Sequence, residues 1–299
     1  MTMQKLLIVS SLLLSACANT SFQALEAYER SDYVVAYPEF KRLAVRGDAD
    51  AQFFVGLMHD EGNGVDEDKV KASHWYELAA EQDHPAACNN LGLLYFRGEG
   101  VPKDTDRAIE FYERAAEHDF APALTNLGVV HLFGHEEDGE VRGRDIRAAK
   151  RLLERAADLG EAKALRILGF MHRRGLGTAK NDEASRGYYE RAAALGDETA
   201  HYYLATLLLG LESNARGSST VATSVSDAER GVMHMRAAAG SGLAAAQYGM
   251  GMIYLRGIGV AEDQVAARDW LQRAADQGLV EAEGKLRTMA VAKPTSPAR

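Results

Sequence analysis

A pattern of small residues returns along this sequence at a nearly fixed interval. Each copy begins with an alanine, and a second small residue follows five positions later. The copies end at Gly56, Gly92, Gly128, Gly169, Ala205 and Gly251. The steps between them are 36, 36, 41, 36 and 46 residues, so two copies carry insertions. A period of this length is typical of solenoids, in which one repeat buries its apolar face only by stacking on its neighbours.

Further landmarks follow each copy in the same order. In the first unit they are Gly62 and Gly64, then Asp68, then Trp75-Tyr76, then Ala79-Ala80. Paired glycines favour a turn with left-handed backbone angles. The aromatic and alanine positions that follow lie on one face of a helix. The sequence therefore predicts an all-α chain of helix pairs, with five full pairs flanked by two half-units.

In this order the motifs A-x-x-x-L-G, G-x-G-V, D, A, W-Y and A-A resemble the Sel-one-like repeat family, relatives of the tetratricopeptide repeats. The resemblance covers residues 33–289 and implies a right-handed α/α superhelical solenoid. It departs from the pattern at His135 to Gly143 and at Glu212 to Ser226. Both insertions fall between the two helices of their unit, so we expect mobile loops on one edge of the solenoid.

The first residues differ from the rest of the chain. Lys5 precedes an apolar run from Leu6 to Leu14, which is too short to span a bilayer comfortably and is typical of a signal peptide. Leu14-Ser15-Ala16-Cys17 resembles the lipobox of bacterial lipoproteins. We expect a signal peptide over residues 1–16, a lipid on Cys17 and a short linker over residues 17–32. The alternative is an ordinary signal peptide with an incidental cysteine.

The lipobox resemblance also implies a location. In that family an Asp after the cysteine retains the protein in the inner membrane, whereas Ala18 stands here. The implied location is the bacterial outer membrane, with the protein facing the periplasm. Residues 290–299 are expected to be a disordered tail.

The charge balance limits the partners. The chain has 34 basic and 43 acidic residues and a formal net charge of −9. Nonspecific nucleic-acid binding is disfavoured, because it depends on clustered Lys and Arg. Cys88 is left without a disulfide partner if Cys17 carries lipid, and two cysteines cannot form a metal cluster.

Two groups of residues could suggest chemistry. His131 and His135, followed by Glu136, Glu137 and Asp138, resemble a set of metal ligands. Against this, His131 occupies a register position that the other repeats fill with aromatic residues, so packing is the favoured interpretation and we expect no metal. Cys88 lies where a small apolar residue fits, and no motif of a hydrolase, metalloprotease or nucleotide-binding enzyme is present. We expect no catalytic residue and no cofactor.

The tetratricopeptide relatives imply which residues meet a partner, because their first helices line the concave face. Applied to this chain, the corresponding positions are Phe53, Asn89, Arg97, Thr125, Arg166, Arg173, Arg174, Tyr202, Tyr248 and Arg256. Such a groove would suit a protein, or an acidic peptide or polymer, through charge-assisted hydrogen bonds. The alternative is that the arginines are solvated on a helix face.

The favoured function is therefore a binding scaffold or adaptor that recruits a protein or an envelope polymer. Two alternatives remain open. One is an enzyme acting on peptidoglycan or β-lactams, although the cysteines that link some relatives to β-lactams are missing here. The other is a host-interaction virulence factor, which free secretion would suit better than a lipid anchor.

Overall fold

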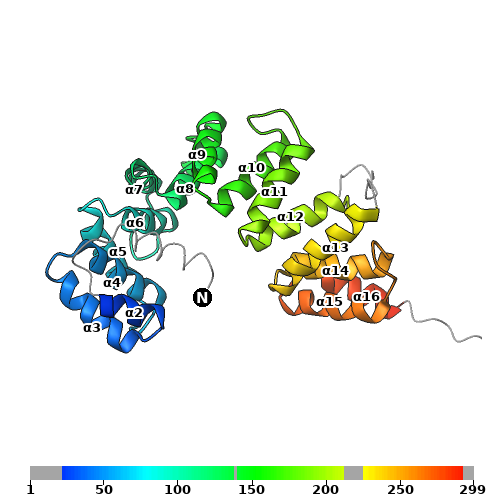
Figure 1. Cartoon of the computed structure of the whole chain (residues 1–299), viewed down its shortest axis with the longest axis horizontal. Helices are drawn as coiled ribbons and strands as arrows, with labels where there is room; N and C mark the ends of the chain where they lie inside the picture. The colour runs from blue at the N-terminus through cyan, green and yellow to red at the C-terminus, as the bar shows by residue number, and fades with distance from the viewer. Residues whose placement is uncertain (1–21, 138–139, 212–224, 292–299) are drawn as a thin grey trace, which may run out of the picture. The chain divides into compact units, whose positions relative to one another are not determined.

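The computed structural model describes residues 22–137, 140–211 and 225–291 (Figure 1). Its helices are α2 (Phe22–Glu29), α3 (Tyr33–Ala44), α4 (Ala49–Glu61), α5 (Lys69–Ala80), α6 (Pro85–Arg97), α7 (Thr105–Glu117), α8 (Ala121–Phe133), α9 (Ile146–Asp158), α10 (Ala162–Arg174), α11 (Asp182–Ala194), α12 (Glu198–Leu208), α13 (Val225–Gly240), α14 (Ala244–Arg256), α15 (Gln264–Asp276) and α16 (Val280–Val291). Two short strands, β1 (His135–Glu137) and β2 (Glu140–Arg142), follow α8.

The chain forms two compact units, residues 1–164 and 165–299, and the division falls within α10. Within each unit, successive helices pack against one another along the chain. The described residues contain six helix pairs, from α4 with α5 to α14 with α15, where five were expected. The six pairs match the six copies of the sequence pattern, and the copy that ends at Ala205 lies in the pair α12 with α13, whose helices are separated in sequence by the second insertion.

The small residue that ends each sequence copy is the point of closest approach within its pair. A Cβ added at Gly56 would lie 2.7 Å from the ring of Tyr76, and one at Gly92 would lie 2.9 Å from the ring of Tyr112. The same contact joins Gly128 to Leu153, Gly169 to Tyr189 and Gly251 to Leu271. The glycine therefore makes room for a large apolar side chain of the second helix, as the repeat pattern predicted.

The turn between the two helices explains the other landmarks. Gly62 ends α4 with φ of 70°, a left-handed angle that glycine adopts without strain. At Gly64 a Cβ would lie 2.5 Å from the Cβ of Tyr33, so this second glycine lets the turn approach the preceding helix α3. Asp68 then caps α5 by accepting the backbone N–H of Lys71 at 3.0 Å.

The N-terminal region differs from the prediction of a linker over residues 17–32. Residues 22–29 form α2, which buries Ala24, Leu25 and Tyr28. The Tyr28 ring lies 5.2 Å from that of Phe54 and 6.2 Å from that of Phe40. The helix forms because these apolar side chains cover the first repeat, a contact that local sequence does not reveal. The proposed signal peptide and Cys17 lie outside the described residues.

The insertions also differ from the expected loops. The strands β1 and β2 pair antiparallel, with His135 opposite Arg142 and Glu136 opposite Val141. Among the described residues this short strand pair is the one departure from helices and turns, because the inserted segment bonds to itself, and the all-α fold class is confirmed. Residues 212–224 of the second insertion lie outside the described residues, whereas Val225 and Ser226 already belong to α13.

The C-terminal helix extends two residues past the predicted boundary at 289. It ends at Val291, and residues 292–299 of the expected tail lie outside the described residues. In the described part of the chain, no helix is both long enough and apolar enough to cross a membrane.

Candidate partner-binding face

Three residues predicted to meet a partner are buried in this structure. Phe53 is 2% exposed, and its ring stacks on that of His84 at 4.9 Å. Thr125 is 1% exposed and donates its hydroxyl to the carbonyl oxygen of Ala121 at 3.0 Å. Asn89 is 7% exposed and bonds to other side chains. The register position three before the landmark therefore serves packing in the first three repeats.

The predicted arginines fall into two groups. Arg166 and Arg173 form ion pairs within their own unit, with Asp197 at 2.9 Å and Asp182 at 3.1 Å respectively. The other three are exposed: Arg97, Arg174 and Arg256. Arg97 lies 3.7 Å from Glu99, and Arg174 lies over the ring of Phe170 at 5.8 Å. Only the exposed group keeps charge available for a partner.

The two predicted tyrosines are half-buried. Tyr202 contacts the ring of Tyr203 at 5.6 Å between centroids. Tyr248 packs against the apolar cluster of Leu271, Ala274 and Ala282. Part of each ring remains accessible, so neither tyrosine is confined to the core.

A row of side-chain hydrogen bonds crosses the first helices of the N-terminal unit. Lys163 donates to Asn126 Oδ1 at 3.1 Å, and Asn126 donates to Asn89 Oδ1 at 3.0 Å. Asn89 donates to Asn90 Oδ1 at 3.1 Å, and Asn90 donates to the hydroxyl of Tyr76 at 3.1 Å. We call these five residues the amide row. It connects α10, α8 and α6 to the second helix α5.

The inner end of the amide row is anchored by charge. Tyr76 donates its hydroxyl to Asp60 Oδ2 at 3.2 Å, and Lys69 bonds to Asp60 Oδ1 at 2.9 Å. Burial raises the pKa of Tyr76, so its hydroxyl stays protonated and can keep donating. The bonds all run in one direction, which orients every amide in the row.

Of the amide row, Asn89 was predicted from the sequence to meet a partner, whereas Asn90, Asn126 and Lys163 were not. A signal existed, because Asn90 and Asn126 both stand two residues before the landmark glycine and 36 residues apart. Both residues are half-buried. An Asn amide has two donor hydrogens and two acceptor lone pairs, and the row uses only part of that capacity.

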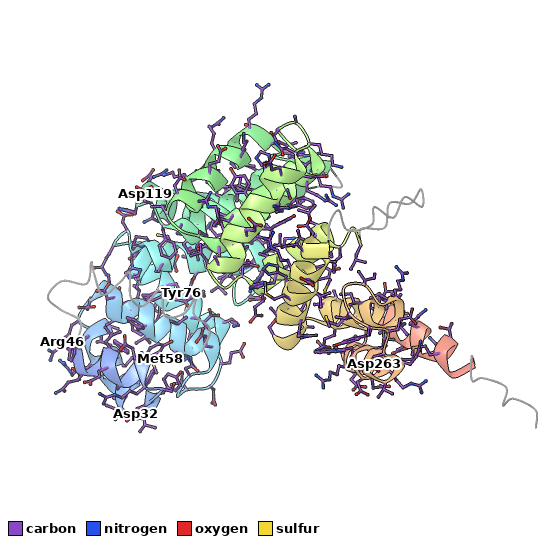
Figure 2. All side chains as sticks on the ribbon, turned by 45° about the vertical axis from the view of Figure 1, so that its right-hand side comes forward. Asp32, Arg46, Met58, Tyr76, Asp119 and Asp263 are labelled. Atoms are coloured by element: carbon purple, nitrogen blue, oxygen red, sulfur yellow. The ribbon has the colours of Figure 1, made fainter. Side chains whose placement is uncertain are left out.

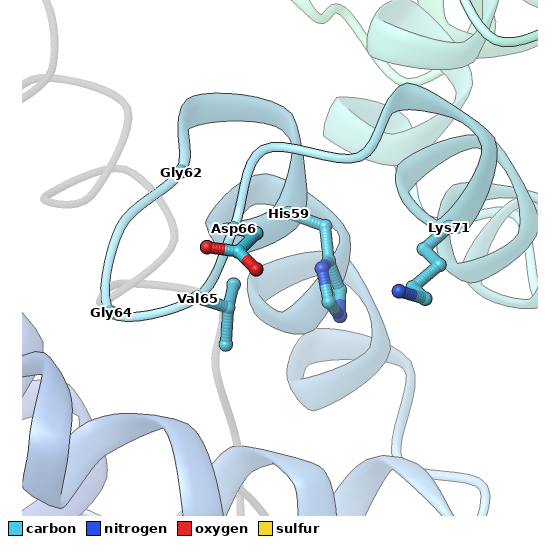
Figure 3. Close-up of a pocket in the computed structure, with 6 residues that line it drawn as sticks. All are labelled: His59, Gly62, Gly64, Val65, Asp66 and Lys71. Atoms are coloured by element: carbon cyan, nitrogen blue, oxygen red, sulfur yellow. The ribbon is translucent and has the colours of Figure 1, made fainter.

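An open depression of about 630 Å³ lies at the turn between α4 and α5 (Figure 3). It is lined by His59, Gly62, Gly64, Val65, Asp66 and Lys71. His59 Nε2 lies 3.2 Å from the Tyr37 hydroxyl, and burial lowers the pKa of His59. Lys71 pairs with Asp68 at 2.8 Å. Charges of both signs are thus present, and the depression selects neither anions nor cations.

The possible metal ligands do not form one cluster. His131 lies in the last turn of α8, 3.2 Å from the carbonyl oxygen of Gly143, whereas His135 belongs to β1 and lies 4.0 Å from Asp106. Asp138 lies outside the described residues. Within residues 22–137, 140–211 and 225–291, no three His, Cys, Asp or Glu side chains could hold one metal ion.

Cys88 lies inside the packing of α6. It is 1% exposed, and burial raises the pKa of its thiol to about 11. Since the thiolate is the nucleophile, this cysteine is kept in its unreactive form at neutral pH.

The C-terminal unit contains a pair of facing imidazoles. His201 Nδ1 of α12 and His234 Nδ1 of α13 are 2.8 Å apart. One ring must donate and the other accept, which requires at least one neutral imidazole. Burial lowers the pKa of both, and the pair joins the two helices that flank the second insertion.

Comparison with known proteins identifies the repeat. The Sel1 repeat matches residues 49–84, 85–120, 121–161, 162–197 and 244–279, which is more than half of the chain. These five matches correspond to all helix pairs described above except α12 with α13. The match confirms the resemblance noted in the sequence.

Solved structures share the architecture. A Sel1 repeat protein from Oxalobacter formigenes is 27% identical, with a TM-score of 0.70 over 86% of this chain and 97% of that one. A protective antigen of uropathogenic Escherichia coli is 25% identical, with a TM-score of 0.51 over 85% and 67%. An immunity protein from Pseudomonas aeruginosa is 19% identical, with a TM-score of 0.52 over 83% and 88%, and shows the fold alone.

Proposed function

Because the chain belongs to the Sel1 repeat family, whose repeats form scaffolds for protein–protein interaction, we propose that it is an adaptor tethered to the bacterial outer membrane. The adaptor faces the periplasm and holds an extended segment of another protein against the first helices of its N-terminal unit. The observation that carries this proposal is the amide row.

The amide row matches the chemistry of a peptide backbone. An extended segment presents N–H and C=O groups in alternation, and oriented amides can donate to one and accept from the other. The edges of Asn90 and Asn126 are fixed by their bonds to Asn89 and Tyr76, so little conformational entropy is lost on binding. Lys163 at the outer end adds a cation that suits a carboxylate on the partner.

The partner can be identified by crosslinking in intact cells followed by affinity purification. With the partner in hand, we expect Asn126→Ala to weaken binding about fivefold, since a hydrogen bond contributes about 1 kcal/mol. Glu113→Ala, an exposed change on the second helix α7, is the matched control. Melting curves of both variants separate lost binding from lost folding. Equal affinities for the two variants would show that the amide row does not contact the partner.

The tether is supported by the lipobox-like residues that end at Cys17. We expect the wild-type chain to take up a fatty-acid probe and to fractionate with the outer membrane. Cys17→Ser should abolish the label and move the protein to the soluble fraction. A labelled, membrane-bound Cys17→Ser protein would exclude lipidation at this position.

A second candidate function is contact with a host at the cell surface. It is favoured by the likeness to the protective antigen of uropathogenic Escherichia coli. The two functions predict opposite sides of the outer membrane. Protease added to intact cells should leave a periplasm-facing adaptor uncut and should digest a surface-exposed protein.

A further inference from the structure

The outer stripe of α3 is unlike the surfaces of the other helices in the N-terminal unit. The helix turns Ala36, Phe40 and Ala44 into the core at a spacing of four residues. On the opposite side it exposes Val34, Val35, Pro38, Arg42, Val45 and Arg46, which we call the α3 stripe. Val34 is 82% exposed and Val45 is 70% exposed, although burial of a valine is normally favourable.

The two basic residues of the stripe, Arg42 and Arg46, are four positions apart and both exposed. Arg46 projects from the end of α3 (Figure 2), and Arg42 bonds to Glu39 at 3.0 Å through its Nε. Lys41 lies beside the stripe over the ring of Trp75 at 4.0 Å. Apolar and basic side chains on one helix face form the pattern that binds an anionic lipid surface. Arg42 and Arg46 lie on the stripe although the chain as a whole has a net charge of −9.

The short segment between Cys17 and α2 favours a lipid surface as the partner of the α3 stripe. Cys17 and Phe22 are five residues apart, which an extended chain spans with at most about 18 Å. A lipid on Cys17 therefore brings the start of α2 to the level of the headgroups. Phe22 is itself 73% exposed, and α3 packs directly on α2 through Tyr28 and Phe40. Nothing comparable in the described residues would bring a second copy of the chain to the α3 stripe.

We infer that the α3 stripe is a membrane-contact surface that rests on anionic headgroups. The inference builds on the proposed tether, which by itself says only that the chain is anchored. It adds that the N-terminal helices lie against the bilayer, with valines in the interface and arginines among the phosphates. The amide row is then presented from a solenoid whose N-terminal end is held at the lipid surface.

The test uses single-cysteine labelling in the acylated full chain. Cys88 is 1% exposed and Cys17 carries the lipid, so an introduced cysteine is the accessible thiol. Val34→Cys and Val45→Cys are labelled with an environment-sensitive fluorophore, and Glu113→Cys on α7 is the control. The proteins are reconstituted in vesicles of phosphatidylethanolamine and phosphatidylglycerol that contain a quencher lipid. We expect several-fold stronger quenching at positions 34 and 45 than at 113.

The same samples separate this inference from the tether. A protein that carries the fatty-acid label but shows equal quenching at all three positions overturns the membrane contact and leaves the tether intact. If the label is absent, sedimentation of the unacylated chain with the same vesicles decides. There Arg46→Gln should lower binding about fivefold, while Arg151→Gln on α9 should not. No vesicle binding, or a dimer that Val45→Asp dissociates, overturns the inference.

Discussion

The helix pairs α4–α5 and α12–α13 close around the same register position in different ways. In α4–α5 the position is Gly56, which lies against the rigid ring of Tyr76. In α12–α13 it is Ala205, and the facing position of the second helix is Met235, with which Ala205 shares a core cluster. Methionine is unbranched and fills irregular space, so it accommodates the additional methyl group.

The turns and bridges of the two pairs differ as well. The α4–α5 turn uses Gly62 and Gly64, whereas the α12–α13 connection contains the second insertion. Gln52 of α4 accepts a bond from Gln82 at 2.8 Å, whereas its counterpart in α12 is His201, bonded to His234. The Sel1 repeat match covers the first pair and omits the second. The fold thus tolerates loss of the consensus when compensating side chains change together.

The largest effect is expected at the buried Tyr76 ring of the pair α4–α5. Tyr76→Ala should lower the free energy of unfolding by about 3–5 kcal/mol, because a large buried aromatic side chain is lost and a cavity remains. Urea denaturation followed by circular dichroism measures this. Glu77→Ala, on the exposed side of the same helix, should change the value by less than about 0.5 kcal/mol. Similar losses for both variants would mean that α5 is not held through Tyr76.

A smaller effect is expected when the pair α12–α13 is given the residues that stand at the same positions in α4–α5. Met235→Tyr should destabilise the C-terminal unit by about 1–3 kcal/mol, since a ring overpacks the space beside Ala205. Adding Ala205→Gly to Met235→Tyr should restore part of the loss, although Ala205→Gly alone should destabilise its helix by about 0.5–1 kcal/mol. Thermal unfolding of the three variants measures the coupling. Strictly additive losses would contradict the compensation.

The bond between His201 and His234 should make the stability of the pair α12–α13 depend on pH, unlike the bond between Gln52 and Gln82 at the pair α4–α5. Burial lowers the pKa of His201 and His234 in the folded chain, so the neutral forms are the stabilising ones. Below the unfolded value of about 6.5 the unfolded chain binds more protons, and stability therefore falls as pH falls. The bond at stake is worth about 1 kcal/mol. His201→Gln should flatten the melting temperature between about pH 7 and about pH 5; an unchanged slope would exclude the bridge as its source.

The smallest effect concerns the junction between repeats. Asp119 (labelled in Figure 2) adopts φ of 55°, a left-handed angle, at a position that is Asp83 in the first repeat and glycine in the four later repeats. Its carboxylate bonds to Arg155 of the following repeat at 2.6 Å. Asp119→Ala keeps the unfavourable angle and loses the ion pair, whereas Asp119→Gly relieves the angle. We expect Asp119→Ala to be about 1 kcal/mol less stable than Asp119→Gly in thermal melts. Because both variants lose the ion pair with Arg155, the reverse order would show that the left-handed angle does not destabilise Asp119→Ala.

The repeat period, the helical pairs and the glycine turns could be read from the sequence by itself. These features depend on local periodicity, since a helix face repeats every three to four residues and a left-handed turn favours glycine. Gly56, Gly62 and Asp68 each have one role that the pattern of the chain already specifies. The family resemblance rests on the same positions and was confirmed for that reason.

Only the tertiary structure decided which of the predicted partner-binding residues are exposed. Phe53 and Thr125 are buried, and Arg166 is bound to Asp197, because helices about 30 residues apart in sequence supply their surroundings. The amide row depends on Lys163 meeting Asn126 across 37 residues, a contact that no local window contains. Side-chain exposure is a property of the packed neighbours, so a single repeat predicts its own helices but not its own surface.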